Sequence, residues 1–345
     1  DLYDTMLIDY EPGTTADKLS KMFGALRPGL VELRGAILEK EPAEKLQGSF
    51  DEVTQIKISS LLAETFGYDL NRGRIDKAVH PFSSGSGQDV RITTRTNLHD
   101  PFNCFYSTIH EVGHGSYEQN IDPKYSLTSI GQGASMGVHE SQSRIYENQL
   151  GRSRAFTAWL FMQMKKHFGD FGIRDADEFY KTVNSVNKGF IRTEADEVQY
   201  NLHVLLRFDL ERALVSGDLL VKDLESAWND RFYQDFGYNV KSASDGCLQD
   251  VHWSVGLFGY FPTYSLGNLY AGCLHEMLRK SCPQFDNDLR AGNLTPATNW
   301  LQEKLQRHGA LKLPSQTISD ACGFEPSEVP LLTYLQTKFS EIYDL

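Results

Sequence analysis

Hydrophobic residues recur every three to four positions over most of the chain, which is the spacing typical of amphipathic helices packed on a core. In the first of these patterns, Pro28 and Gly29 predict a kink or a break. The helices predicted in this way cover residues 15–40, 49–67, 190–216, 221–236 and 265–280, and another begins at residue 295. The sequence therefore predicts a mainly α fold.

Residues that begin and end helices support these assignments. Ser49 followed by Glu52 forms a capping-box pattern, and Gly67 would end the helix that it begins. Thr295 is predicted to cap a later helix whose first position is Pro296, where the missing N–H of proline is tolerated. These signals place helix starts near residues 49 and 295.

One stretch follows the period of a strand instead. Residues 90–95 (VRITTR) alternate in polarity, and they follow a loop-like segment at residues 81–87 (PFSSGSG). We expect a short strand or hairpin near residues 89–96. No internal repeat or low-complexity linker marks a domain boundary, so a single domain over residues 1–345 is predicted.

Charge and cysteine content exclude several classes of protein. The chain has 34 Lys and Arg against 46 Asp and Glu, a formal net charge of −12, whereas binding to a phosphate backbone usually needs clustered basic residues. No apolar run approaches the roughly 20 residues that span a bilayer. The five cysteines are scattered without a CxxC pair, which is typical of reduced thiols. We therefore expect a cytoplasmic protein that binds neither nucleic acid nor membrane.

The strongest chemical signal is an HExxH motif that begins at His110. On a helix, His110 and His114 lie on one face, so both imidazoles can reach a single metal ion. Glu111 lies about 100° around the helix, which suits a general base for a metal-bound water. Gly113 and Gly115 are poor helix formers, and we expect another element or a substrate to pack close to them.

A catalytic zinc site usually has three protein ligands and one open position. Glu140 follows His114 by 26 residues, which is enough for a turn and the start of a second helix packed against the first. Glu118 and Glu147 are rival carboxylates. A ligand at Glu118 would have to reach along the helix of His114, and Glu147 is more typical of a solvated or ion-paired residue. Glu140 is therefore predicted as the third ligand.

Six short motifs occur in order along the chain. They are HPF at residues 80–82, DVRIT at 89–93, HEVGH at 110–114, HESQ at 139–142, IRTEAD at 191–196 and GCLQDVHW at 246–253. With these motifs the whole chain resembles the carboxypeptidase Taq family of zinc-dependent metallocarboxypeptidases. Members of that family are longer, so the resemblance implies that an N-terminal helical part, which helps to cover a deep cleft, is missing here.

The resemblance implies a function and its cofactor. His110, His114 and Glu140 match the metal ligands of the family, and Glu111 matches its general base. We expect hydrolysis of the C-terminal peptide bond of peptides with a free C-terminus, with Zn²⁺ as the ion and Co²⁺ as the other ion that suits two histidines and a carboxylate. The family also implies a homodimer.

Further site residues follow from the remaining motifs. Arg192 matches the arginine that is proposed to bind the terminal carboxylate in the family, and its structural alternative is an ion pair with Glu194 or Asp196. His252 and Tyr264 look like the pair that related helical zinc peptidases direct at the scissile carbonyl.

Several other residues are expected near the substrate or behind the site. Tyr260 is a rival to Tyr264, and Asp89 and Arg91 are expected to contact the substrate or to support the site from a strand edge. Supporting positions are predicted for His80, His139, Thr93, Asp196 and Asp250.

Two alternatives to a carboxypeptidase keep the same motifs. An endo-acting oligopeptidase would use the same ligands, and it would also cleave peptides with an amidated C-terminus. A truncated, non-catalytic fragment would fold but bind almost no zinc.

Overall fold

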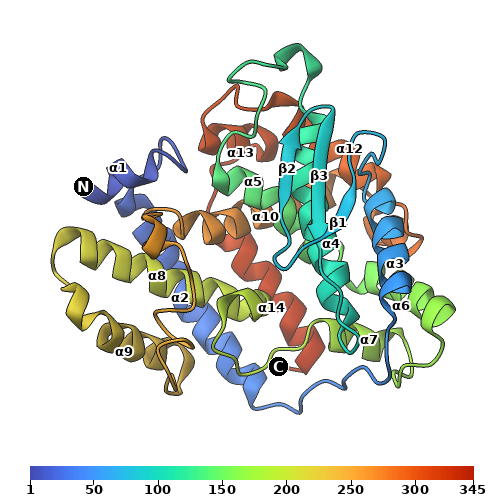
Figure 1. The fold of residues 1–345 in the computed structure, drawn as a ribbon, viewed down its shortest axis with the longest axis horizontal. Coiled ribbons are helices and arrows are strands. Elements are labelled where there is room, and N and C mark those ends of the chain that lie inside the picture. Colours follow the sequence, from blue (N-terminus) through green and yellow to red (C-terminus); the bar gives the residue numbers. More distant parts are fainter.

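Helices build most of the structure, which is a computed structural model that describes residues 1–345 (Figure 1). The helices are α1 (Leu2–Leu7), α2 (Ala16–Leu38), α3 (Glu52–Thr65), α4 (Pro101–Asn120), α5 (Met136–Arg144), α6 (Arg154–Phe168), α7 (Ala176–Val183), α8 (Glu197–Ser216), α9 (Leu224–Phe236), α10 (Pro262–Ser281), α11 (Phe285–Arg290), α12 (Thr295–Lys304), α13 (Pro314–Cys322) and α14 (Val329–Tyr343). A π-helical segment (Ile145–Leu150) continues α5, and short 3-10 turns lie at Pro123–Tyr125, Arg192–Glu194, Val221–Asp223, Trp253–Val255 and Gln306–His308. The mainly α prediction is confirmed.

The predicted interruption at Pro28 is wrong. Helix α2 runs without a break through this residue, and the side chain of Thr15 caps its first turn. Leu26 and Leu30 on either side of the proline are fully buried. Burial of the apolar face therefore outweighs the cost of about 3 kcal/mol that a proline carries inside a helix.

Two of the predicted helix starts shift by a few residues. The cap of α3 is Asp51 and not Ser49, because the Asp51 carboxylate accepts a hydrogen bond from the N–H of Thr54 at 2.9 Å. Thr295 is the first residue of α12 and not its cap, a position that Leu294 occupies. In both places the helices themselves are present as predicted.

The single sheet has three short strands, β1 (Ile75–Lys77), β2 (Ser83–Ser86) and β3 (Asp89–Thr94), in the order β1-β3-β2. Strand β3 pairs with β1 in parallel and with β2 antiparallel. The hairpin predicted near residues 89–96 is therefore present. The segment at residues 81–87, which the sequence predicts as a loop, contains β2. The sequence gives no sign of this strand, because Ser and Gly have low strand propensity.

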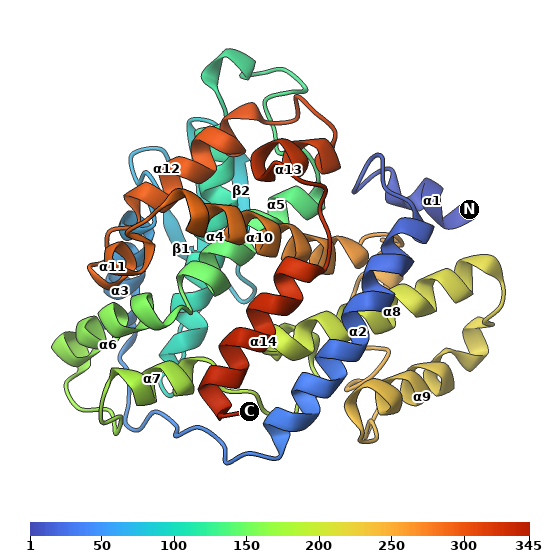
Figure 2. The ribbon, with the colours of Figure 1, turned by 180° about the vertical axis from the view of Figure 1, so that it is seen from behind.

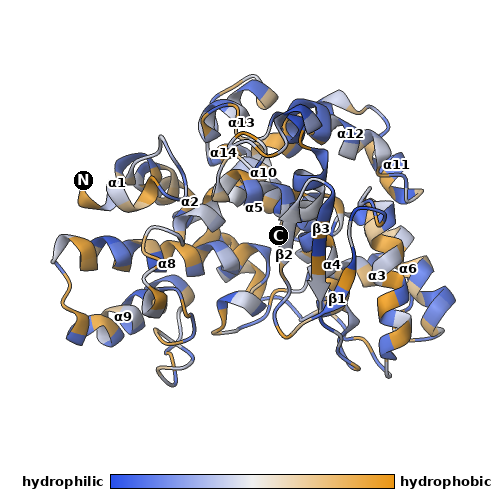
Figure 3. Ribbon diagram, turned by 45° about the horizontal axis from the view of Figure 1, so that its top comes forward, coloured by the Kyte–Doolittle hydropathy of each residue, from blue (hydrophilic) through white to orange (hydrophobic).

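Helix α4 lies between the sheet and α5, and α10 packs along α5 on the opposite side (Figures 1 and 2). Helix α10 is buried along almost its whole length and also contacts α8 and α14. Figure 3 shows hydrophobic and hydrophilic residues on the same helices, as expected for helices with one buried face. None of the helices combines the length and apolar character that would be needed to cross a bilayer.

Glycines allow α5 to approach both of its neighbours closely. A Cβ atom on Gly113 of α4 would lie 2.5 Å from the carbonyl oxygen of Gln142 and from the Cα of Ser143 in α5. A Cβ atom on Gly267 of α10 would lie 2.6 Å from the side chain of Glu140. The prediction that another element packs against Gly113 is confirmed, and α4, α5 and α10 form the close-packed centre of the fold.

We predict that Gly113→Ala destabilises the protein by about 1–3 kcal/mol, because the added methyl group meets backbone atoms that cannot rotate away. Gly24→Ala is the matched control: Gly24 is an exposed residue inside α2 with no atom near its Cβ position, and alanine there should stabilise the helix by about 0.5–1 kcal/mol. Urea unfolding of both variants measures the difference. Equal stability of the two variants would contradict the close contact of α4 with α5.

Candidate active site

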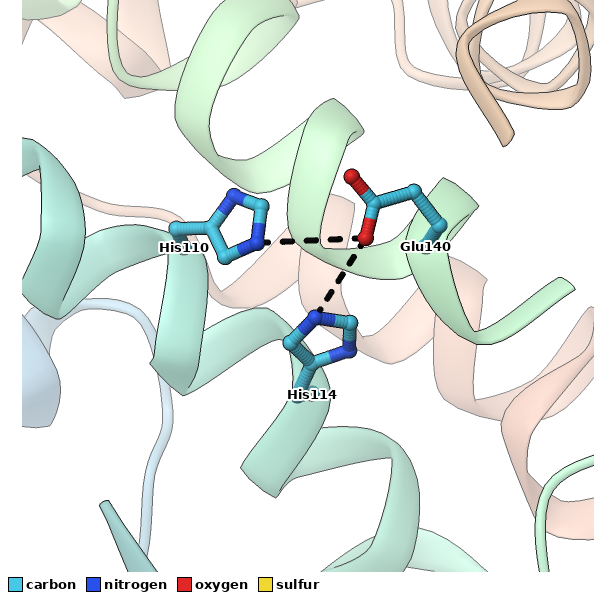
Figure 4. A group of neighbouring side chains, drawn as sticks. All are labelled: His110, His114 and Glu140. Atoms are coloured by element: carbon cyan, nitrogen blue, oxygen red, sulfur yellow. Dashed lines mark ion pairs between the residues drawn. The ribbon is translucent and has the colours of Figure 1, made fainter. Parts of the chain in front are cut away.

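Helices α4 and α5 bring the three predicted ligands together. His110 and His114 lie one turn apart on α4, and Glu140 faces them from α5 (Figure 4). One ligand atom from each residue lies within 4.8 Å of the other two. Oε2 of Glu140 is 3.5 Å from Nε2 of His114 and 3.9 Å from Nε2 of His110. The two Nε2 atoms and one carboxylate oxygen therefore point to a common centre.

The other ring nitrogen of His110 is held by a buried carboxylate. His110 Nδ1 lies 2.9 Å from Oε2 of Glu147, which also contacts Arg144 at 3.4 Å and, through Oε1, Arg152 at 3.2 Å. Burial alone would raise the pKa of Glu147, but the hydrogen bond from His110 and the two guanidinium groups lower it to about 2. An ionised carboxylate only accepts hydrogen bonds, so Nδ1 of His110 donates and Nε2 keeps its lone pair for the centre.

The Glu140 carboxylate is fixed in the same way. Arg144, one turn further along α5, donates from Nε to Oε1 of Glu140 at 2.7 Å, and its guanidinium stacks on the ring of Tyr200. Although Glu140 is buried, the charges of Arg144 and the neighbouring imidazoles hold its pKa well below the usual range. One oxygen is thus occupied by Arg144, and the other is left for the centre.

His114 has a third histidine behind it. Its Nδ1 lies 2.7 Å from Nδ1 of His139, and Nε2 of His139 lies 2.9 Å from Oε1 of Glu118. Burial lowers the pKa of His114 to about 4, so the imidazole is neutral, which is the form that binds metals. Two imidazoles and one ionised carboxylate are a donor set that fits a divalent metal ion.

A buried carboxylate lies next to this centre on the helix. Glu111 is only 6% exposed, and burial together with the charge of Glu140 raises its pKa to about 7, against the opposing effect of His110. A divalent cation at the centre would lower this pKa by the same coulombic effect that His110 exerts. With a cation at the centre, Glu111 is therefore an ionised carboxylate that can accept a proton from a neighbouring water molecule.

A cavity of about 950 Å³ opens onto the centre. Its wall contains the three ligand residues and Glu111, and it continues along Ser83–Gly85 of β2 and past the motif that holds Arg192. Tyr260 and Tyr264 line it from the segment that leads into α10. The cavity is therefore large enough for a peptide end beside the centre.

Arg192 lines this cavity, but it does not lie at the start of a helix as expected. It belongs to a 3-10 turn that precedes α8, because Asp196 caps α8 and starts that helix at residue 197. Its Nε and Nη2 donate to Oδ1 of Asp250 at 3.1 and 2.7 Å, and its Nη1 donates to Tyr200 at 3.1 Å. The alternative ion pairs with Glu194 or Asp196 are not formed.

His252 and Tyr264 are in contact, although only one of them reaches the cavity. Nε2 of His252 lies 3.1 Å from the hydroxyl of Tyr264. Tyr264 lines the cavity, whereas His252 does not. In the structure His252 is linked to the cavity through Tyr264, and the expectation that both groups point at a substrate carbonyl stays a prediction.

Asp89 and Arg91 do not reach the cavity either. Both are exposed on β3, where the two side chains pair with each other at 2.9 Å. The period of the strand gives the reason: Val90 and Ile92 face the core, so the residues between them face solvent. The structure therefore does not bring these two residues to the cavity, and their expected contact with the substrate, or their support of the site, stays a prediction.

The sequence predicts the contacts behind the site only in part. Glu147 is ion-paired, one of its two expected states, and His139 has a supporting position, but the sequence does not show that Glu147 holds His110 or that Glu118 holds His139. The spacing offers a signal for Glu147, which follows Glu140 by seven residues and so lies on the same helix face. His80 is exposed at the cavity rim. Asp250 bonds to Arg192 and Arg207, and Nδ1 of His252 lies 4.0 Å from its Oδ1.

Another buried carboxylate anchors α5 to the N-terminal part of the chain. Glu11 accepts hydrogen bonds from the N–H of Gly137 and from the hydroxyl of Tyr270, each at 3.0 Å. Gly137 lies in the first turn of α5, where unpaired N–H groups favour a negative charge. The first turn of the helix that carries Glu140 is therefore held by Glu11.

Residues 1–339 match the family model described as carboxypeptidase Taq (M32) metallopeptidase. Carboxypeptidase 1 of Bacillus subtilis is 38% identical over 99% of this chain and 69% of its own, and thermostable carboxypeptidase 1 of Thermus thermophilus is 38% identical over 99% and 68%.

Solved structures agree with these sequence matches. The M32 carboxypeptidase of Deinococcus radiodurans superposes with a TM-score of 0.96 at 38% identity, covering 99% of this chain and 70% of that one. Metallocarboxypeptidase 1 of Trypanosoma cruzi superposes with a TM-score of 0.95 at 34% identity, covering 98% and 72%. The protein is therefore a metallocarboxypeptidase, and the chain belongs to the carboxypeptidase Taq (M32) family.

Proposed function

We propose that the enzyme is a zinc carboxypeptidase that removes the last residue of peptides, with His110, His114 and Glu140 as the metal ligands. The observation that carries the proposal is that each ligand has one donor atom directed at the common centre while its other polar atom is occupied by a buried partner. When bound, zinc would polarise the scissile carbonyl and make a water molecule more acidic. Cobalt suits the same donor set.

Glu111 is proposed as the general base. It would take the proton from the attacking water and pass it to the leaving amine, so that the carboxylate is regenerated at the end of each turnover. Its burial and its position beside His110 on the cavity wall support this role.

Tyr264 is proposed to donate a hydrogen bond to the oxyanion of the tetrahedral intermediate. Its hydroxyl lines the cavity, and the contact with His252 restricts its orientation. Burial and the nearby charge of Arg192 lower the pKa of His252 to about 4, so this imidazole is neutral. His252 is thus proposed to act through Tyr264, and Tyr260 to contact the substrate on the same wall.

Arg192 is proposed to bind the terminal carboxylate of the substrate. A guanidinium has five N–H donors, and three of them are used by Asp250 and Tyr200, which leaves two. Asp250 also pairs with Arg207, so two cations face one anion and the cluster keeps a net positive charge. This charge would attract a peptide that ends in a free carboxylate.

Three further properties are proposed for the whole protein. Residues 1–345 are proposed to act as a single catalytic domain, because one hydrophobic cluster includes residues from Tyr3 to Tyr343. A cytoplasmic location is supported by five free cysteines. A homodimer is proposed from the resemblance to the family alone.

Glu111→Gln is the first test. We predict that the variant keeps its zinc but loses about 10²–10⁴-fold in kcat, because the amide cannot accept the proton of water. The measurement combines zinc content by atomic spectroscopy with hydrolysis of a peptide with a free C-terminus. Turnover at the wild-type rate would rule out the proposed base.

A peptide and its C-terminal amide test Arg192. We predict that amidation lowers kcat/KM by about 10–100-fold in the wild type, because the charge-assisted hydrogen bonds to the carboxylate are lost. In Arg192→Ala the two peptides should be cleaved at similar rates, while Asp250 keeps Arg207 as a partner.

Arg95→Ala is the control for this test, because Arg95 is another arginine of the cavity wall. This variant should preserve the preference for the free carboxylate. If the wild type cleaves the amidated peptide as efficiently as the peptide with a free C-terminus, then the endo-acting alternative holds and the proposed role of Arg192 is wrong.

A further inference from the structure

The two histidines of the metal centre have different partners behind them. His110 contacts a carboxylate directly through Glu147, whereas His114 contacts a second imidazole, His139, which in turn contacts Glu118. His114 and Glu118 lie one turn apart on α4, and His139 reaches between them from α5. The three side chains form one chain of hydrogen bonds that leads away from the centre.

The direction of these hydrogen bonds follows from Glu118. Its Oε1 accepts the backbone N–H of Gly133 at 3.2 Å and is 2.9 Å from Nε2 of His139, so it accepts from this imidazole as well. A neutral imidazole has one donor and one acceptor nitrogen. Nδ1 of His139 is therefore an acceptor, and Nδ1 of His114 donates to it. Nε2 of His114 is then left with a free lone pair.

The opposite arrangement would remove a metal ligand. If Nδ1 of His139 carried the proton, His114 would accept it at Nδ1 and would carry its own proton on Nε2. That proton would point at Oε2 of Glu140, 3.5 Å away, and no lone pair would face the centre. The position of the proton between His114 Nδ1 and His139 Nδ1 thus decides whether His114 can bind a metal ion through Nε2.

The packing around His139 holds it in place for this contact. A Cβ atom on Gly133 would lie 2.6 Å from the His139 ring, so only glycine leaves room for the imidazole. The ring of Tyr117 lies 5.1 Å from it, and the Tyr117 hydroxyl accepts the N–H of Ala134 beside Gly133. The side chains of Glu118 and His139 are 12% and 21% exposed, and both residues line the cavity beside the centre.

We propose that Glu118 and His139 are positioning residues that fix the Nδ1 proton of His114 and so retain the metal ion in the centre. The inference rests on the proposed role of His114 as a ligand. Loss of a hydrogen-bond partner behind a metal-binding histidine typically weakens metal binding roughly 10–100-fold. The two residues contribute no atom to the reaction, and they act only through His114.

Zinc affinity of the purified enzyme, measured by competition with a chromophoric chelator, is the test. We predict a roughly 10–100-fold higher Kd for His139→Phe, which has no acceptor. His139→Gln should lose less, because its amide oxygen can accept from Nδ1 of His114. Glu118→Gln should also lose less, because its amide can pair with either proton arrangement of His139.

His275→Phe is the matched control. His275 is a buried imidazole in α10 that packs against Phe285 and Tyr334 and makes no hydrogen bond. The zinc affinity of the His275→Phe variant should equal that of the wild type. The midpoint of thermal unfolding of each metal-free variant separates the two effects, because a positioning residue changes Kd without lowering this midpoint below that of the control.

Each outcome bears on one claim. If His139→Phe binds zinc as tightly as the wild type, the inference is overturned while the proposed function stands. If His139→Phe does not fold, the same result for Glu118→Gln overturns the inference. An equal loss of affinity in His139→Phe and His275→Phe overturns it as well. A wild-type protein that binds no zinc overturns the proposed function, and the inference falls with it.

Discussion

The close contact between α4 and α5 is the constraint on which the rest of the site depends. Gly113 has no side chain, and the backbone of Gln142 and Ser143 fills the space where a Cβ would be. Because Gly113 lies between His110 and His114, this contact sets how far the two imidazoles are from Glu140. On the other side of α5, Gly267 of α10 allows an equally close approach at Glu140 itself. The ligand geometry is thus a product of helix packing and not of a flexible loop.

Charge pairing makes this arrangement stable when it is buried. Glu140 is bonded to Arg144, and Glu147 contacts both Arg144 and Arg152. Each of these carboxylates stays ionised in a dry environment because a guanidinium lies next to it. Asp250, which pairs with Arg192 of the cavity wall, is likewise a carboxylate that faces two arginines. Glu111 has no guanidinium beside it. Burial therefore raises its pKa, whereas the pKa values of Glu140 and Glu147 are lowered.

The sequence predicted what depends on local spacing. The i and i+4 spacing of His110 and His114 gives their shared helix face, and the distance along the chain favoured Glu140 correctly as the residue brought beside them. The six short motifs by which the chain resembles the family also predicted the reaction, and the comparisons support that prediction. What the sequence could not give depends on tertiary contacts. Asp89 and Arg91 lie in a recognisable motif, but only the pleat of β3 in the folded protein shows that they face solvent.

The most direct measurement is anomalous diffraction from crystals grown with zinc, recorded on both sides of the zinc absorption edge. The account predicts one strong peak at about 2.0–2.2 Å from Nε2 of His110, Nε2 of His114 and an oxygen of Glu140. A strong peak elsewhere in the chain, with none between these three residues, would contradict it.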